Sequence, residues 1–424
     1  MDAAKTFFKP VESLSTPNAP KLSLPFRYLI TGMTFLIAGV LLIVIKPEIM
    51  AEHYIRSPFV LGLAHIFALG FITMIMLGAM FQFIPVIAET SLFSEPLGKL
   101  NYWVFLSGLI GTVFSFILKQ SYLGIFTGIV SLSLLIFLFN ISATIVKSIR
   151  RDIVIWHVIA GCVFLFATAI LGPLLGANLK AGFIRNPLSL IFSHFILSAL
   201  GWITITTMGV SYQLIPMFIL SHNFPTKYAS LSILSITAGT LGLAISPLFK
   251  NTQGLGFISL LLILSGVILY LIQMAVIFRA RMRKKIDTAI YGTIIAKSML
   301  ALATITGTVV FLTDAPFQWH YLPSILLLLG FAGLYIMGMM HKIVPFLVWY
   351  NKYSSKIGIE KVPMTKDMVS EPLIQPILYF WTGGIAGISI GAALSNIMLI
   401  RFSALAMLFG AVLFFWNIAN VFRK

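Results

Sequence analysis

The sequence predicts an all-α integral membrane protein with twelve transmembrane helices in three related groups of four. Hydrophobic residues make up 59% of the 424 residues and charged residues only 10%, whereas a soluble domain of this size carries far more charge. Apolar stretches also recur along the whole chain, each of at least ~18 residues, which is the length that crosses hydrocarbon. We place these stretches at 26–46, 59–87, 101–118, 121–146, 153–178, 187–220, 228–247, 254–278, 288–312, 318–349, 372–394 and 397–421.

A shared pattern in the second, sixth and tenth stretches predicts the grouping by fours. These segments read LGFITMIMLGAMFQFIP (69–85), LGWITITTMGVSYQLIP (200–216) and LGFAGLYIMGMMHKIVP (329–345), and successive copies start 131 and 129 residues apart. Each interval contains four helices, so we predict one transmembrane domain (26–424) built from the repeat units 26–150, 151–286 and 287–424.

The residues that repeat suggest structural roles. Glycines eight residues apart lie on roughly one face of a helix and let a neighbouring helix approach closely. The proline at the end of each copy is predicted to end or kink its helix, because it removes a backbone donor. A second echo is an amide near the end of the last helix of each group, at Asn140, Gln273 and Asn417.

The net charge of +17 reflects membrane topology rather than nucleic-acid binding. An even number of helices puts both termini on one side, and the basic loops fall on that side, so the termini are predicted to be cytoplasmic. Residues 1–25 are polar and are predicted to form a mobile cytoplasmic tail. We therefore expect a protein of a bacterial inner membrane whose contacts are with lipid and not with nucleic acid. The basic residues on the predicted cytoplasmic side are Lys5, Lys9, Lys21, Arg27, Lys147, Arg150, Arg151, Arg279, Arg281, Arg283, Lys284, Lys285, Lys352, Lys356, Lys361 and Lys366.

Three histidines fall in the outer halves of the three equivalent helices. His65 and His194 lie about 12 Å from the outer ends of the second and sixth helices, at 1.5 Å per residue, and His320 begins the tenth. A polar ring in hydrocarbon is costly unless it has a partner, so these residues are candidates for a functional site. His157 and His341 lie near the cytoplasmic ends of their helices, where histidines are common.

Twelve helices in three quartets, with a histidine on the second, resemble subunit I of the haem–copper oxidase superfamily (cytochrome c oxidase subunit I-like). The run LAHIFALGFITMIMLGAMFQFIPV also resembles short oxidase-like proteins and the nitric-oxide-response NnrS family. The resemblance implies a b-type haem bound by His65, with His320 or His194 as second ligand, and a copper ion at His194. It implies redox chemistry or the handling of a gas such as nitric oxide, with a redox partner or a respiratory complex.

The sequence also departs from that family. Its seventh helix, KYASLSILSITAGTLGLAIS, has no histidine to complete a copper site, so oxygen reduction by this chain alone is not supported. Lys297 lies inside the ninth helix, where it would serve a proton path, neutralise a haem propionate or an anionic substrate, or extend towards the cytoplasm. Two alternatives stay open: a cofactor-free channel or transporter, and an accessory subunit that keeps the oxidase fold. Whether the chain is an enzyme stays open too.

Overall fold

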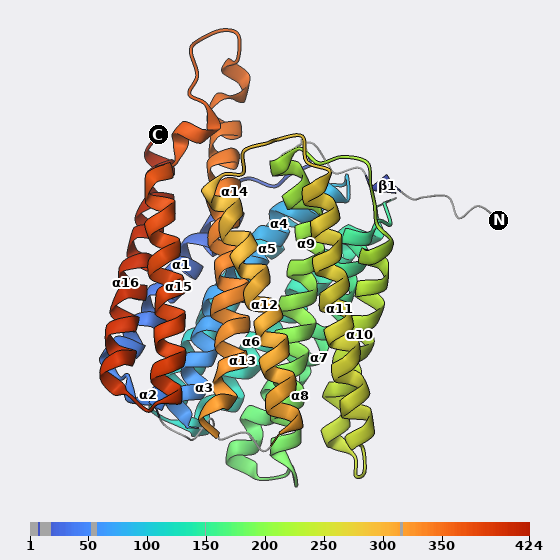
Figure 1. Ribbon diagram of the computed structural model, residues 1–424, viewed down its shortest axis with the longest axis vertical. Coiled ribbons are helices and arrows are strands. Elements are labelled where there is room, and N and C mark those ends of the chain that lie inside the picture. Colours follow the sequence, from blue (N-terminus) through green and yellow to red (C-terminus); the bar gives the residue numbers. More distant parts are fainter. Residues whose placement is uncertain (1–6, 9–17, 52–56, 149, 314–316) are drawn as a thin grey trace, which may run out of the picture. The chain divides into compact units, whose positions relative to one another are not determined.

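The computed structural model describes residues 7–8, 18–51, 57–148, 150–313 and 317–424, and nearly all of them are helical (Figure 1). Twelve helices in this part of the chain are long and apolar enough to cross a membrane, as expected. The two short strands β1 (Phe7–Phe8) and β2 (Phe224–Pro225) pair antiparallel. Most of the predicted tail, residues 1–6 and 9–17, lies outside the described residues.

The elements follow the predicted order. The first four spans are α1 (Ser23–Ile45); α3 (Pro58–His65), η1 (Ile66–Thr73) and α4 (Met74–Ile87); α5 (Glu95–Ile117); and η2 (Gln120–Tyr122) with α6 (Leu123–Val146). The next four are α7 (Ile153–Ala181); α8 (Pro187–Ile196), η3 (Leu197–Ile205) and α9 (Thr206–Ile219); α10 (Lys227–Ile245) with η4 (Ser246–Leu248); and α11 (Gln253–Arg279). The last four are α12 (Thr288–Leu312); α13 (Tyr321–Ile325), η6 (Leu326–Gly333) and α14 (Leu334–Tyr353) with η7 (Ser354–Lys356); α15 (Glu371–Ala393); and α16 (Ile397–Ala419) with η9 (Asn420–Arg423). The short elements α2 (Glu48–Ala51), η5 (Phe317–His320) and η8 (Thr365–Met368) lie between spans.

The described residues form two compact units, named here for their place in the sequence. The central unit consists mainly of Phe83–Lys285 and holds α5 to α11. The terminal unit consists mainly of Lys21–Gln82 and Ile286–Lys424, and it holds α1 to most of α4 together with α12 to α16.

The repeated glycines lie where the second helix of each group meets the first, as predicted. A Cβ added to Gly209 would lie 2.2 Å from the Cβ of His157 on α7, and one added to Gly78 would lie 2.5 Å from the Cβ of Tyr28 on α1. At Gly338 the nearest atom is the carbonyl oxygen of Ala289 on α12, at 2.7 Å. Only a glycine permits these approaches, so the glycines set the spacing of the helix pairs.

The repeated amides fix the start of the third helix in each group. Each side chain accepts a hydrogen bond from one backbone N–H there and donates one to a backbone carbonyl, so two polar backbone groups are satisfied inside an apolar region. The pairs are Asn140 with Ser94 N and O (3.1 and 2.8 Å), Gln273 with Ala229 N and Pro225 O (3.2 and 2.8 Å), and Asn417 with Ser370 N and O (3.0 and 3.1 Å).

The repeated prolines do not all end their helices. Helices α4 and α9 stop two and three residues after Pro85 and Pro216, and each closes with a hydrogen bond to the proline carbonyl, from Thr90 N (3.1 Å) and Ser221 N (2.9 Å). This is the Schellman pattern of a helix end. After Pro345, however, α14 continues for eight residues to Tyr353. Of the two predicted effects of the proline, ending the helix or kinking it, the first therefore does not apply to this third copy.

A π-helical segment occurs at the same place in each of the three long helices, which periodicity did not predict. The segments are η1, η3 and η6, and a wider turn of this kind displaces backbone carbonyls from their usual partners. In η3 the hydroxyl of Thr204 donates to the Ala199 carbonyl at 2.8 Å. In η6 the equivalent residue is Gly333, which has no hydroxyl. Trp381 of α15 donates its Nε1–H to the Leu329 carbonyl at 3.0 Å, one residue after Leu328, the equivalent of Ala199.

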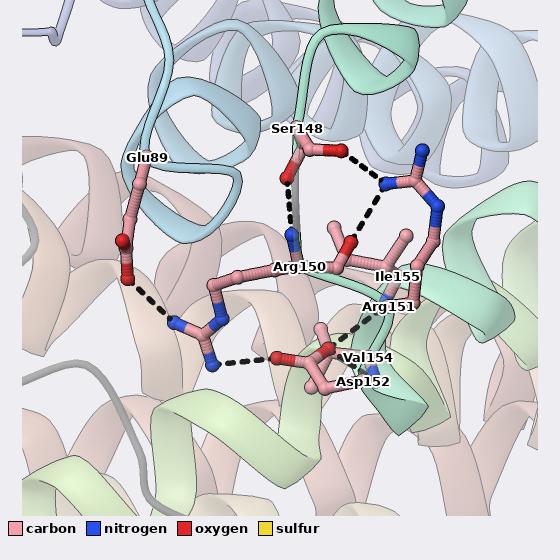
Figure 2. A network of polar contacts seen from close by, with 7 residues as sticks. All are labelled: Glu89, Ser148, Arg150, Arg151, Asp152, Val154 and Ile155. Carbon is pink, nitrogen blue, oxygen red and sulfur yellow. Dashed lines mark hydrogen bonds and ion pairs between the residues drawn. The ribbon is translucent and has the colours of Figure 1, made fainter.

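A polar network in the central unit connects the end of α4 with the start of α7 (Figure 2). Asp152 caps α7, because its Oδ1 accepts from the N–H groups of Val154 and Ile155, both at 3.1 Å. Its Oδ2 accepts from Arg150 at 2.6 Å, and the same guanidinium reaches Glu89 at 3.4 Å. Arg150, one of the many basic residues, therefore helps to hold the cap at the start of α7.

Replacing Asp152 with alanine is expected to lower the free energy of unfolding by about 1–2 kcal/mol, because two N–H groups lose their acceptor. Asp152→Asn is the matched control: it keeps an acceptor oxygen and loses the ion pair, so it should cost less than about 1 kcal/mol. Denaturant unfolding of the purified chain in detergent measures both variants. Equal losses would show that the ion pair, and not the cap, carries the stabilisation.

Candidate functional site

His65 is the last residue of α3 and directly precedes the π-helical segment η1. Its Nδ1–H donates to the Leu61 carbonyl at 2.7 Å, which fixes the ring and makes Nε2 the nitrogen that would bind a metal. The side chain is half-buried although it lies eight residues into the span. An imidazole at that depth is costly unless it has polar partners, so the position is a candidate for a functional role.

His194 lies in the central unit, three residues before η3, and is also half-buried. Its Cε1 would be 3.5 Å from a Cβ on Gly172 of α7. The next residue, Pro173, removes the N–H that would bond to Ala169, and the hydroxyl of Ser131 donates to that carbonyl. The histidine therefore lies beside Gly172 and Pro173 of the continuous helix α7, and the carbonyl that Pro173 leaves without a backbone donor is satisfied.

His320 lies at the end of η5, just before α13, and is half-buried. The repeat register places it apart from His65. His65 precedes its repeat glycine, Gly70, by five residues, whereas His320 precedes Gly330 by ten. Five residues correspond to about 7.5 Å along a helix and a rotation of about 140°, so the two histidines do not occupy equivalent positions in their repeats.

Lys297 is buried within α12 of the terminal unit, with only 4% of its surface exposed. Its ammonium donates to the carbonyl and the hydroxyl of Thr293, at 3.0 and 3.3 Å, and lies 5.7 Å above the ring of Tyr335. The amine therefore points one turn back along its own helix and stays covered. The predicted roles on a proton path or beside an anion remain predictions.

His157 and His341 are packed inside the helix bundle, which the sequence interpretation did not predict. Both are buried, with exposed fractions of 0% and 2%. In each, Nδ1–H donates to the carbonyl four residues earlier at 2.7 Å, and Nε2 has no hydrogen-bond partner within the described part of the chain.

The described ranges contain no cluster of candidate metal ligands. No group of three or more His, Cys, Asp or Glu side chains there is arranged to hold a metal ion. The carboxylates that the structure describes lie in loops or at helix ends, for example Asp287, which caps α12 and pairs with Lys342 at 2.5 Å.

No protein-family model matches the sequence, and no curated protein matches it. The fold and composition define a multi-pass integral membrane protein whose twelve candidate spans imply contact with a lipid bilayer.

Proposed function

We propose that the chain is an oxidase-like membrane protein that binds one b-type haem through His65 and handles a diatomic gas such as nitric oxide. The recurrence of glycine contacts, amide clamps and π-helical segments in the three quartets supports an architecture like that of oxidase subunit I.

Two properties of the His65 ring carry the haem proposal: its hydrogen bond to the Leu61 carbonyl and its partial exposure. A histidine that binds a metal usually donates its second ring nitrogen to a carbonyl or carboxylate, as His65 does to Leu61. His157 and His341 share this anchor but have almost no exposed surface. His65 differs because it is held in the same way and still presents surface to a group that could cover it.

The positions of the histidines favour a haem that a single histidine, His65, would hold. The register places His320 at another level and angle, and the seventh helix contributes no histidine. A haem iron with one protein ligand keeps a coordination position for a small gas molecule, which is the chemistry that the group supplies when bound. In this proposal His65 holds the iron, while Lys297 supplies a buried cation in the same unit for an anionic group. Copper at His194 stays a further prediction.

The test is a pyridine haemochrome spectrum, with iron and copper analysis, of the full-length chain purified from haem-replete cells. Wild-type protein is expected to carry about one haem per chain. His65→Ala should lose it nearly completely, because the iron loses its only strong protein ligand. His320→Ala and His194→Ala are the matched controls and should keep the haem.

Each other outcome has a clear meaning. Loss of haem in both His65→Ala and His320→Ala would replace the single-ligand proposal with two axial histidines. A well-folded wild-type protein without absorbance would overturn the haem proposal. It would favour a cofactor-free transporter or, if the chain copurifies with a cytochrome complex, an accessory subunit.

A further inference from the structure

A short segment after helix α14 forms a basic protrusion, defined here as residues 354–366 of the terminal unit. Figure 1 shows it at the top of the view, beyond the ends of α15 and α16. It exists because α14 continues past Pro345, whereas α4 and α9 stop shortly after their equivalent prolines. The third repeat therefore has a feature that the other two lack.

Hydrogen bonds hold the base of the protrusion. Trp349 of α14 donates its Nε1–H to the Pro363 carbonyl at 2.6 Å, and Asp367 accepts from the Met364 N–H at 3.0 Å. The end of the chain also takes part, because Lys424 donates to the Asp367 carbonyl and Tyr353 donates to the Lys424 carbonyl. The segment is fixed at both ends.

The tip is a defined turn. Ile359 N–H donates to the Lys356 carbonyl at 3.1 Å, Ile357 has φ −60° and ψ 128°, and Gly358 has φ +81°. These are the angles of a type II β-turn, which requires a residue that tolerates positive φ at its third position. The turn leaves Ile357 and Ile359 exposed, at 58% and 83%.

The surface of the protrusion combines apolar and basic side chains. Met364 is exposed to 59% beside the two isoleucines, and the lysines around them outnumber the single carboxylate, Glu360, which pairs with Lys356 at 2.7 Å. Burying an exposed isoleucine is worth about 1.5–3 kcal/mol, so the tip offers an apolar anchor within a basic rim. The exposed lysines of the protrusion are Lys356, Lys361 and Lys366.

The position of the protrusion along α14 argues against insertion into lipid. The ion pair between Lys342 and Asp287, at the start of α12, is taken as the depth at which the hydrocarbon region ends on this side of the terminal unit. From Lys342 to the end of α14 at Tyr353 the helix rises by about 16 Å, whereas a headgroup layer is only about 5–8 Å thick. Even with a tilt of about 40° the rise exceeds that layer.

We infer that the basic protrusion is a docking site for an acidic soluble protein, at the end of the terminal unit that carries Lys424. The isoleucines at the tip provide the contact that is buried, and the lysines select a partner of negative charge. A second copy of this chain fits poorly, because it would bring one basic protrusion against another basic surface. This inference does not depend on the presence of a haem.

The test places the photo-crosslinking amino acid p-benzoylphenylalanine at position 359 of the full-length chain in living cells. We expect an adduct with a soluble protein of low isoelectric point. The same amino acid at position 390, an exposed isoleucine within the α15 span, is the control and should yield lipid adducts only. The captured protein is then purified and its binding to the purified chain is measured.

Binding should weaken about tenfold in the Lys356→Glu, Lys361→Glu double variant and should fall with added salt, because the attraction is between exposed charges. An unchanged thermal unfolding curve in detergent will show that this surface variant is folded. Adducts at position 359 with lipid only, with a second copy of the chain, or with no molecule would each overturn the inference. So would a captured protein whose binding is insensitive to the charge reversal.

Discussion

Replacing Gly209 with alanine is expected to destabilise the central unit by about 3 kcal/mol, the upper end of the usual cost of overpacking. The added methyl group would lie 2.2 Å from the Cβ of His157, an atom that no side-chain rotation can move. Helices α7 and α9 would have to separate by about 1 Å at this contact, which a close-packed interior resists. Unfolding of the purified chain by heat or denaturant in detergent measures the loss.

Gly161 provides the matched control on the same helix pair. A Cβ there would lie 2.0 Å from the hydroxyl oxygen of Thr206, but the next nearest atom is 3.3 Å away. That hydroxyl makes no hydrogen bond within the described residues, so it can rotate away without losing one. We expect Gly161→Ala to cost less than about 1 kcal/mol. Equal losses in the two variants would show that close backbone approach at Gly209 is not the controlling contact.

Contacts made by residue types that repeat along the sequence, such as the glycines and amides, could be predicted from the sequence. A glycine lacks a side chain wherever it occurs, so Gly209 could be assigned to a helix contact from its register alone. The three amides could likewise be recognised as a set, although their partners at the starts of the third helices could not be named. Span boundaries were less exact. Helix α5 begins at Glu95 and not near 101, because Ser94 caps it and Pro96 follows in the first turn.

Other features depend on tertiary contacts that periodicity does not record. A π-helical segment differs from an α-helix by a small change in turn size, which the apolar pattern of 326–333 does not show. Its partner Trp381 lies 52 residues away in the sequence. Burial of His341 likewise depends on which side of α14 meets neighbouring helices. The sequence therefore assigned each candidate histidine to a helix, whereas the contacts around each histidine could be seen only in the structure.

Replacing Trp381 with leucine is expected to destabilise the terminal unit by about 4 kcal/mol. The indole is completely buried, and large-to-small changes at such sites cost about 3–5 kcal/mol. The variant also leaves the Leu329 carbonyl without its 3.0 Å donor inside η6. Trp381→Phe separates the two effects, since it keeps most of the volume and loses only the N–H, for about 2 kcal/mol. Thermal unfolding of the full-length chain in detergent measures both variants.

A double-mutant cycle with Gly333, which lies beside the indole, tests the contact between Trp381 and η6. A Cβ on Gly333 would lie 3.6 Å from the indole nitrogen and 3.4 Å from the Leu328 carbonyl oxygen. Gly333→Thr alone should destabilise, because the rest of the side chain competes with the indole for this space. In the Trp381→Leu background the same threonine should cost less, because the indole no longer occupies this space. Its hydroxyl can then donate to Leu328, the equivalent of Ala199, which accepts from Thr204 in the second repeat. A double-mutant cycle with a coupling of about 1 kcal/mol or more is therefore expected. If Gly333→Thr costs the same in both backgrounds, residue 333 and the indole do not compete for this space, and the π-helical segment of helix ten is held by other contacts.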